Sequence, residues 1–263
     1  MTPLLDGDIL RYEAGSIAEY GLDEVPNFIV AEEFLNRRID EICAAVGATQ
    51  PPVIYLSGKG NFREDIAKAK VYKGNRKDVK KPYHFRNLTV YLKAVYGAIV
   101  VDGMEADDAL CIHQTLHLEQ RDTVICTRDK DLRQCPGWHY GWESGKQPEF
   151  RLRWVEGIGD IELSADRKSV KGWGDKFFYT QLLTGDTVDN IPGCPKVGPV
   201  KAYKLLSDAQ TIEEMYRIVL DEYTNVYAED ASEELREQAY LLWMVRELNE
   251  DGSPVMWREP NVL

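Results

Sequence analysis

The chain has 263 residues, of which 44% are hydrophobic and 29% charged, and its formal net charge is −12. This composition is typical of a soluble globular protein of enzyme size, and the length allows one α/β domain with or without a helical extension. No apolar run is long enough to cross a bilayer and the N-terminus lacks the pattern of a secretion signal, so we expect neither a membrane protein nor an exported one.

The first part of the chain alternates short apolar runs with stretches of helical periodicity. Residues 3–9 predict a strand, and residues 28–46 predict a helix from the spacing of their apolar side chains. Residues 53–56 predict a second strand, and a helical stripe over 85–95 leads into a third at 98–101. Strands that alternate with helices predict a mainly parallel central sheet flanked by helices.

Acidic residues follow two apolar runs, 98–101 and 123–126, which both have the composition of strands buried on two faces. Ligands of an open α/β sheet bind at the carboxyl ends of its strands. Either acidic cluster alone could simply stabilise a helix N-terminus or lie in a solvated turn. Together they favour a divalent cation, because closely spaced carboxylates repel one another. These acids are Glu105, Asp107 and Asp108 in the first cluster, and Asp129 and Asp131 in the second.

Positive charge is concentrated in one segment of this acidic protein. Residues 59–86 contain ten basic and three acidic residues. Such a segment is typical of a phosphate-binding surface, although a solvated loop is the common alternative. Its position between a predicted strand and the acidic clusters favours a function.

The later part of the chain predicts a hairpin at residues 138–154, which would cap the sheet edge, and two amphipathic helices at 211–223 and 232–248. His113 and His117 have a spacing that could chelate zinc, but no third ligand lies at a matching position. We therefore assign the two histidines to packing or to the surface.

Residues 184–206 combine two acids with a turn rich in glycine and proline and a helix from about residue 200. Asp186 and Asp189 are three residues apart, so one helical turn would place them on the same side. Glycines in such a turn let backbone N–H groups approach a phosphate, and a helix N-terminus favours negative charge. Lys196 and Lys201 add positive charge.

Five cysteines are scattered along the chain without a C-x-x-C pair, which predicts free thiols in a reducing compartment. We therefore expect a cytoplasmic protein. The five are Cys43, Cys111, Cys126, Cys135 and Cys194.

Several motifs occur in one order over about residues 4–206. They are Asp6 after the first strand, YKGNR at 72–76, EADD at 105–108, TRDKDL at 127–132 and GDxxDN ending at Asn190. This order resembles the 5′-nuclease family of flap endonucleases and 5′→3′ exonucleases, especially its small bacteriophage members. If the protein is encoded by a bacteriophage, we expect it in the cytoplasm of the host.

The resemblance implies a PIN-like 5′-nuclease fold with a helical arch and a helix-three-turn-helix that binds duplex backbone at residues 191–206. It places the nuclease core at residues 1–183, including the basic arch segment 59–86, and the helical extension at 184–263, packed on the core as one unit. The implied activity is metal-dependent hydrolysis of DNA phosphodiesters from or near 5′ ends.

The resemblance also implies two metal ions, Mg²⁺ or Mn²⁺, about 4 Å apart, which suit an all-oxygen ligand set. One ion would lie around Asp6, Glu105 and Asp107, with Asp108 beside the pair. The ligands of the other would be Asp129, Asp131, Asp186 and, through water, Asp189.

Contacts with DNA follow from the same resemblance. Lys73 and Arg76 would contact the scissile phosphate as catalytic residues, and Tyr72 would stack on a nucleobase. Further DNA-binding residues would be Lys77, Gly193, Lys196, Gly198 and Lys201, with a potassium ion at the helix-three-turn-helix. The expected partner of this monomer is duplex DNA with a 5′ end, flap or nick, and also RNA in RNA–DNA hybrids.

One position departs from the family pattern. Ser57-Gly58 stands where the family usually has an aspartate after its second strand, so the first metal would keep an extra water or take Asp8 instead. Two alternative functions are a PIN-type ribonuclease and a non-catalytic DNA-binding protein. The duplex-binding motif argues against the first, because ribonucleases of that type lack it, and the retained acids argue against the second.

Overall fold

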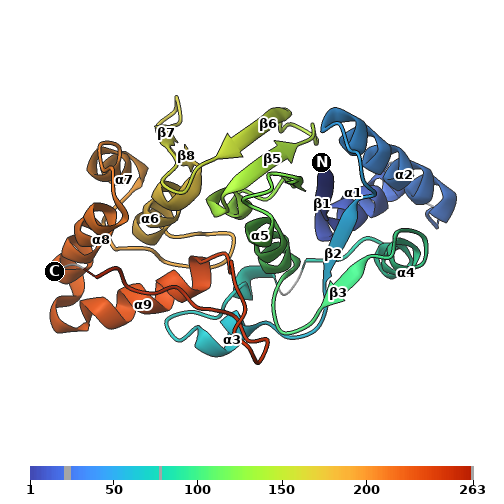
Figure 1. Cartoon of the computed structure of the whole chain (residues 1–263). Helices are drawn as coiled ribbons and strands as arrows, with labels where there is room; N and C mark the ends of the chain where they lie inside the picture. The colour runs from blue at the N-terminus through green and yellow to red at the C-terminus, as the bar shows by residue number, and fades with distance from the viewer. Residues whose placement is uncertain (21–24, 77–78, 262–263) are drawn as a thin grey trace. The chain divides into compact units, whose positions relative to one another are not determined.

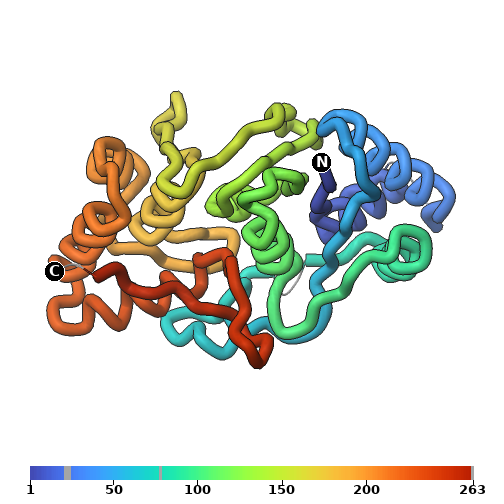
Figure 2. The backbone as a smooth tube through the Cα atoms, viewed as in Figure 1, coloured from blue at the N-terminus to red at the C-terminus, as the bar shows by residue number. Residues whose placement is uncertain are grey.

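The computed structural model describes residues 1–20, 25–76 and 79–261, so Lys77 lies outside the described residues. The chain forms two compact units, each assembled from separate segments, which can be followed by colour in Figures 1 and 2. Unit 1 comprises Met1–Asn61, Val79–Lys130 and Gly137–Trp154, and unit 2 comprises Phe62–Asp78, Asp131–Pro136 and Val155–Leu263.

Unit 1 is built on a mainly parallel sheet with the strand order β3-β2-β1-β4-β5-β6. Parallel pairing joins β1 to β2 and β4, β2 to β3, and β4 to β5. The predicted central sheet is confirmed, and β5 and β6 form the edge predicted as a hairpin. The strands are β1 Thr2–Asp6, β2 Val53–Ser57, β3 Ile99–Val101, β4 Thr123–Cys126, β5 Gly137–Gly141 and β6 Phe150–Val155.

Helices cover both faces of this sheet (Figure 1). Helices α1 (Gly7–Glu19), α2 (Phe28–Ala45) and α4 (Phe85–Tyr96) share one hydrophobic core with β1, β2 and β4. Helix α5 (Ala106–Leu116) contacts the same three strands but contributes no side chain to that core, so it packs on the other face. The predicted helices 28–46 and 85–95 are confirmed.

The first predicted strand is wrong beyond Asp6, because the chain turns there into α1. The Asp6 side chain caps this helix, with Oδ1 accepting from the backbone N–H groups of Asp8 at 3.1 Å and Ile9 at 3.2 Å. Gly7 permits the turn, since a Cβ there would lie 2.6 Å from the carbonyl oxygen of Tyr55 on β2. The expectation that β3 is buried on both faces is also wrong: Ile99 is 45% exposed, because β3 is an edge strand.

Unit 2 is mainly helical. Its core joins side chains from all four of its longer helices, among them Phe178, Leu206, Val219 and Leu235. The predicted boundary between residues 183 and 184 lies inside this unit, because the helix that ends there packs against those that follow. Its elements are α3 Phe62–Ile66, β7 Ile161–Leu163, β8 Val170–Gly172, α6 Gly174–Thr184, α7 Pro199–Leu206, α8 Ile212–Tyr227 and α9 Ala231–Leu242.

Helix α9 ends at Leu242, six residues before the predicted end at residue 248. The guanidinium of Arg63 lies at this end: it donates to the carbonyl oxygen of Leu241 at 3.0 Å and to that of Trp243 at 2.6 Å. Arg63 has no exposed surface. The buried arginine therefore satisfies carbonyl groups that a helix terminus leaves unpaired.

The segment predicted as a helical arch is helical only in part, where the structure describes it between residues 59 and 86. This part contains α3, a short 3₁₀ turn at Gly74–Arg76 and the start of α4. Lys73, just before the turn, has a φ of +51°, which a right-handed helix excludes.

None of the helices in the described ranges is long and apolar enough to cross a membrane.

The prediction of five free thiols is wrong for two cysteines. Cys43, Cys126 and Cys194 are free, whereas Cys111 and Cys135 are disulfide-bonded. A disulfide depends on proximity in the folded chain, which the spacing of cysteines in the sequence does not report.

Candidate active site

Asp6 lies at the carboxyl end of the central strand β1 and is 2% exposed. Its Oδ2 accepts a hydrogen bond from the Thr127 hydroxyl at 2.8 Å. Burial, and then the nearby Asp8 carboxylate, raise the pKa of Asp6 to about 6. An ionised carboxylate in this position is therefore unfavourable by itself and would be stabilised by a cation.

Thr127 connects two of the predicted metal ligands. Besides donating to Asp6, its hydroxyl oxygen accepts from the backbone N–H of Asp129 at 2.9 Å. The loop after β4 is thus tied to the end of β1, its neighbour in the sheet. The sequence motif included Thr127, but nothing in the pattern indicated this bridging role.

The first acidic cluster forms the N-terminus of α5. Glu105 is the N-cap residue, and its backbone N–H donates to Asp108 Oδ2 at 3.2 Å. Asp108 is completely buried, whereas Asp107 is half-buried in the first helical turn. The helix-capping alternative thus holds for Glu105 and Asp108, and Asp107 adds a negative charge to the first turn.

Gly58, which stands where 5′-nucleases usually have an aspartate, has no room for a larger side chain. A Cβ at residue 58 would collide with Oδ1 of Asp102, which accepts from the backbone N–H of Lys59 at 2.6 Å. Asp102, which the sequence analysis did not identify, therefore occupies the space of a side chain at Gly58. Asp8, the suggested substitute, forms an ion pair with Arg11 at 2.6 Å, so a metal would compete with that cation.

The other predicted acidic ligands belong to unit 2. Oδ1 of Asp131 accepts from the side-chain amide of Gln181 at 2.5 Å. Asp186 is 4% exposed, and its Oδ1 accepts from the backbone N–H groups of Val188 at 2.8 Å and Asp189 at 3.4 Å. The contacts of Asp186 fix a tight turn. The carboxylates of Asp131 and Asp186 are thus both oriented by residues of unit 2.

Asp189 brings together the residues predicted to act on the phosphate. Its carboxylate oxygens lie 2.7 Å from the Arg76 guanidinium and 3.7 Å from Lys73 Nζ. The backbone N–H of Lys73 also donates to the Asp189 carbonyl oxygen at 3.0 Å. Two cations that could bind phosphate thus contact an acid that could bind metal.

The prediction that Tyr72 stacks on a nucleobase is wrong. Tyr72 is 7% exposed in the core of unit 2, and its hydroxyl donates to Asp189 Oδ2 at 3.1 Å. An aromatic ring beside basic residues can stack on a nucleobase or pack in a core, and the sequence does not show whether the ring is buried. Here the ring packs in the core and its hydroxyl orients a carboxylate.

The predicted metal ligands are divided between the two units. Among the described residues no group of three or more acidic, histidine or cysteine side chains is arranged to hold a metal ion. The oxygen donors suit a hard cation in kind, and the raised pKa of Asp6 favours one nearby. Unit 1 holds Asp6, Glu105, Asp107, Asp108 and Asp129, and unit 2 holds Asp131, Asp186 and Asp189.

The glycine-proline turn of unit 2 is closed by two glycines. Gly185 and Gly193 have φ values of +70° and +72°, and a Cβ on either would collide with the backbone at the other end of the turn. The N–H of Gly193 donates to Gln238 Oε1 at 2.6 Å. This donor is therefore already used by a buried side chain, and the assignment of Gly193 to DNA binding stays a prediction.

Two predicted DNA contacts of this turn remain exposed. Lys196 has no ion pair in the described part of the chain, and Gly198 is the N-cap of α7. Lys201 differs, because its Nζ lies 2.5 Å from a Glu222 carboxylate oxygen. Lys196 and the N-terminus of α7 thus form the clearest site for an anion in this turn.

Comparisons with known proteins agree with this architecture. Residues 173–253 match the family model of the 5′-3′ exonuclease C-terminal SAM fold. The structure is similar to the bacteriophage T5 flap endonuclease, solved with DNA and metal ions, with a TM-score of 0.58, 12% identity and coverage of 92% of this chain and 98% of that one. The fold is that of a 5′-nuclease.

A second solved structure supports the same fold. The catalytic core of Rad2, solved with a DNA substrate, has a TM-score of 0.54 and 15% identity, over 98% of this chain and 83% of that one. The resemblance to 5′-nucleases and the predicted fold class are thereby confirmed.

Sequence relatives are much longer than this chain. DNA polymerase I of Rhizobium leguminosarum is 30% identical over 172 residues, which are 62% of this chain and 15% of the polymerase. The polymerase of Pseudomonas aeruginosa is 28% identical over 219 residues, or 76% and 22%. The chain thus spans less than a quarter of the length of these two relatives.

Proposed function

We propose that the protein is a metal-dependent 5′-nuclease that hydrolyses DNA phosphodiesters at or near 5′ ends, as an exonuclease, a flap endonuclease or both. The observation that carries this proposal is the contact of Lys73 and Arg76 with Asp189. Cations suited to a phosphate and an acid suited to a metal ion lie at one place in a 5′-nuclease fold. Cleavage of 5′-labelled flap, nicked and blunt substrates, compared side by side, tests it.

The proposed cofactors are two hard divalent cations, Mg²⁺ or Mn²⁺, with the predicted acidic residues as their ligands. Bound cations of this kind activate water and stabilise the leaving oxygen of a phosphodiester. The protein's own contribution is to orient the carboxylates: Thr127 holds Asp6, the α5 N-terminus holds Asp108, and Gln181 holds Asp131. Lys73 and Arg76 would bind the scissile phosphate and stabilise its developing charge.

The proposed partner is duplex DNA, bound through the turn that precedes α7. Lys196 and the exposed N-terminus of α7 supply a positive charge and backbone donors for a phosphate of the duplex. A potassium ion in the same turn is part of this proposal.

Cleavage is expected to require Mg²⁺ or Mn²⁺ and to be abolished by EDTA. The physical reason is that a bound divalent cation lowers the pKa of its water and so supplies a nucleophile at neutral pH, which Lys73 and Arg76 do not. The measurement is single-turnover cleavage of a 5′-flap substrate with and without chelator. Full cleavage in EDTA would exclude the metal-dependent mechanism.

DNA binding is expected to weaken steeply with salt despite the acidic net charge, because each phosphate contact releases condensed counterions. Lys196→Ala should reduce the slope of log K against log salt by about 1. Lys201→Ala is the matched control: Glu222 already neutralises that lysine, so its slope should change less. Equal slopes in the wild type and the Lys196 variant would place the duplex contact elsewhere.

A further inference from the structure

Asp102 directly follows the edge strand β3, as Gly58 directly follows its neighbour β2. The parallel register pairs Ser57 with Val101, so Gly58 and Asp102 are the next residues of two adjacent strands. The N–H of Gly58 donates to the carbonyl oxygen of Val101 at 2.7 Å, which keeps the two strand ends together. Asp102 therefore lies at the carboxyl end of the sheet, where open α/β sheets bind their ligands.

The Asp102 carboxylate lies where a side chain at residue 58 would begin. A Cβ on Gly58 would collide with Oδ1 of Asp102, and the family pattern has an aspartate at this position. The chain thus lacks a carboxylate that extends from β2 but has one at nearly the same place that extends from β3. The negative charge of this corner of the site is supplied from the neighbouring strand.

Ser57, which precedes this position, contacts two parts of the predicted metal site. Its backbone N–H donates to the carboxylate of Asp8, two residues after Asp6, at 3.2 Å. Its hydroxyl oxygen accepts from the backbone N–H of Ala106 at 2.9 Å. Ala106 is the first residue of α5, in the middle of the first acidic cluster. Asp102 therefore belongs to the same edge of unit 1 as these predicted ligands.

Asp102 has a free carboxylate oxygen, whereas both oxygens of Asp8 are engaged. Oδ1 of Asp102 accepts from the backbone N–H of Lys59 at 2.6 Å, and Oδ2 has no partner within residues 1–20, 25–76 and 79–261. The Asp102 side chain is exposed. In Asp8, Oδ1 pairs with Arg11 at 2.6 Å and both oxygens accept from Ser57 N–H. A cation at this edge would therefore find a free acceptor on Asp102 but would compete for Asp8.

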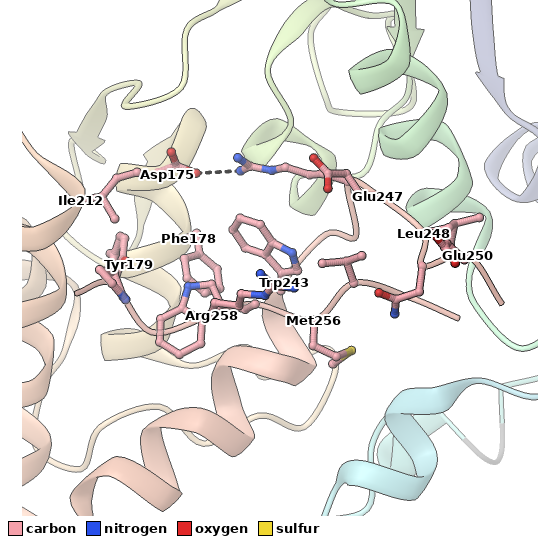
Figure 3. A pocket seen from close by; sticks show the side chains of 15 residues that line it. Asp175, Phe178, Tyr179, Ile212, Trp243, Glu247, Leu248, Glu250, Met256 and Arg258 are labelled. Carbon is pink, nitrogen blue, oxygen red and sulfur yellow. Dashed lines mark hydrogen bonds and ion pairs between the residues drawn. The ribbon is translucent and has the colours of Figure 1, made fainter. Parts of the chain in front are cut away.

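Acids also line a cavity of about 580 Å³ in unit 2, but arginines accompany them there (Figure 3). Asp175 lies 2.7 Å from the Arg246 guanidinium, the pair joined by the dashed line, and Arg258 is a second cation of the lining. Both arginines would repel a divalent cation. Glu250, another acid of this lining, is therefore a suitable control for cation binding.

We propose that Asp102 replaces the aspartate missing at residue 58 and holds the first metal ion through a water molecule. An aspartate at residue 58 would extend its carboxylate one carbon beyond the Cβ position that Asp102 Oδ1 occupies, so a water fills the difference. Mg²⁺ commonly keeps several of its waters, and carboxylates that accept from such waters orient them. This inference rests on the proposed function, because it adds a residue to one of the two proposed metal sites.

Titration of the protein with Mn²⁺ without DNA, followed by electron paramagnetic resonance, tests the proposal, because bound Mn²⁺ loses its sharp solution signal. Asp102→Asn should raise the dissociation constant of one Mn²⁺ about tenfold, the lower end of the effect of losing a residue that orients a metal ligand. The other ion should bind as in the wild type. The Tm in EDTA should stay the same, because asparagine retains an Oδ1 that accepts from Lys59 N–H.

Single-turnover cleavage distinguishes Asp102 from a direct ligand. In Asp102→Asn the Mg²⁺ concentration for half the maximal rate should rise about tenfold, while the rate at saturating Mg²⁺ should fall by less than about threefold. Asp107→Asn should instead stay impaired at saturating Mg²⁺, since more metal does not replace a carboxylate that binds the ion directly.

The matched controls are Asp122→Asn and Glu250→Gln. Asp122 is an exposed acid of unit 1 that precedes β4, so its variant removes the same charge at the opposite edge of the sheet. Both controls should bind Mn²⁺ as the wild type does. The proposal is overturned if Asp102→Asn binds both ions no more weakly than Asp122→Asn, or if it weakens both ions equally and lowers the Tm. A wild type that binds no Mn²⁺ would overturn the proposed function as well, so the two failures are distinguishable.

Discussion

Replacing Asp107 by asparagine is expected to lower single-turnover cleavage of a 5′-flap substrate by on the order of 10³-fold at saturating Mg²⁺. Asparagine retains the size of the side chain but not the negative charge that a hard cation needs. DNA affinity should stay the same or rise, because one negative charge that repels phosphate is removed. Asp107 suits this experiment because it is half-buried, so that its side chain is accessible to a metal ion.

The matched control for this variant is Asp122→Asn. Asp122 is an exposed acid of the same unit and pairs with His117 at 3.1 Å. It should cleave at the wild-type rate. If Asp107→Asn instead loses DNA binding and cleaves normally once bound, the assignment of Asp107 to a metal ion is wrong.

Lys73→Ala is expected to lower single-turnover cleavage by on the order of 10²-fold, the scale of losing one preorganised electrostatic contact. A cation at the scissile phosphate stabilises charge that grows in the transition state more than it stabilises the bound substrate. Affinity measured in Ca²⁺, which we expect to bind without supporting turnover, should therefore change much less. Rapid-quench measurements at saturating enzyme separate the two effects.

Lys68→Ala is a close control for this experiment. Lys68 belongs to the same basic segment and also pairs with one carboxylate of unit 2, Glu233 at 3.3 Å, but its partner is not a proposed metal ligand. If both variants lose the same modest affinity and cleave at the wild-type rate when saturated, Lys73 has no catalytic role.

Elements with a strong local pattern were predictable from the sequence. The buried strand β4 and the helix α2 have the expected bounds to within a few residues, because their apolar spacing reflects their burial. Helix α1 was not predicted, since it contains two glycines that usually indicate breaks. Gly15 is required there by packing: a Cβ would lie 2.6 Å from the Pro82 side chain.

The sequence predicts a set of site residues but not the contacts that those residues make. The order of the motifs predicts the acids and the Lys73–Arg76 pair, yet the partners of several of these residues are far away in the sequence. Tyr72 is buried against Asp189, and the Gly193 amide bonds to Gln238, 45 residues later. Local patterns contain no information on such pairs, which only the folded chain brings together.

Because the two units are built from alternating segments of the chain, they can complete their folding only at different times during synthesis. Unit 1 has all its segments once residue 154 has left the ribosome, but unit 2 begins at Phe62 and continues to the end of the chain. Arg63 can meet Leu241 only after a further 178 residues have been made, which takes roughly 10 to 35 s at elongation rates of about 5–20 residues per second. A product truncated before Leu241 would lack the two backbone carbonyl groups to which this buried guanidinium donates.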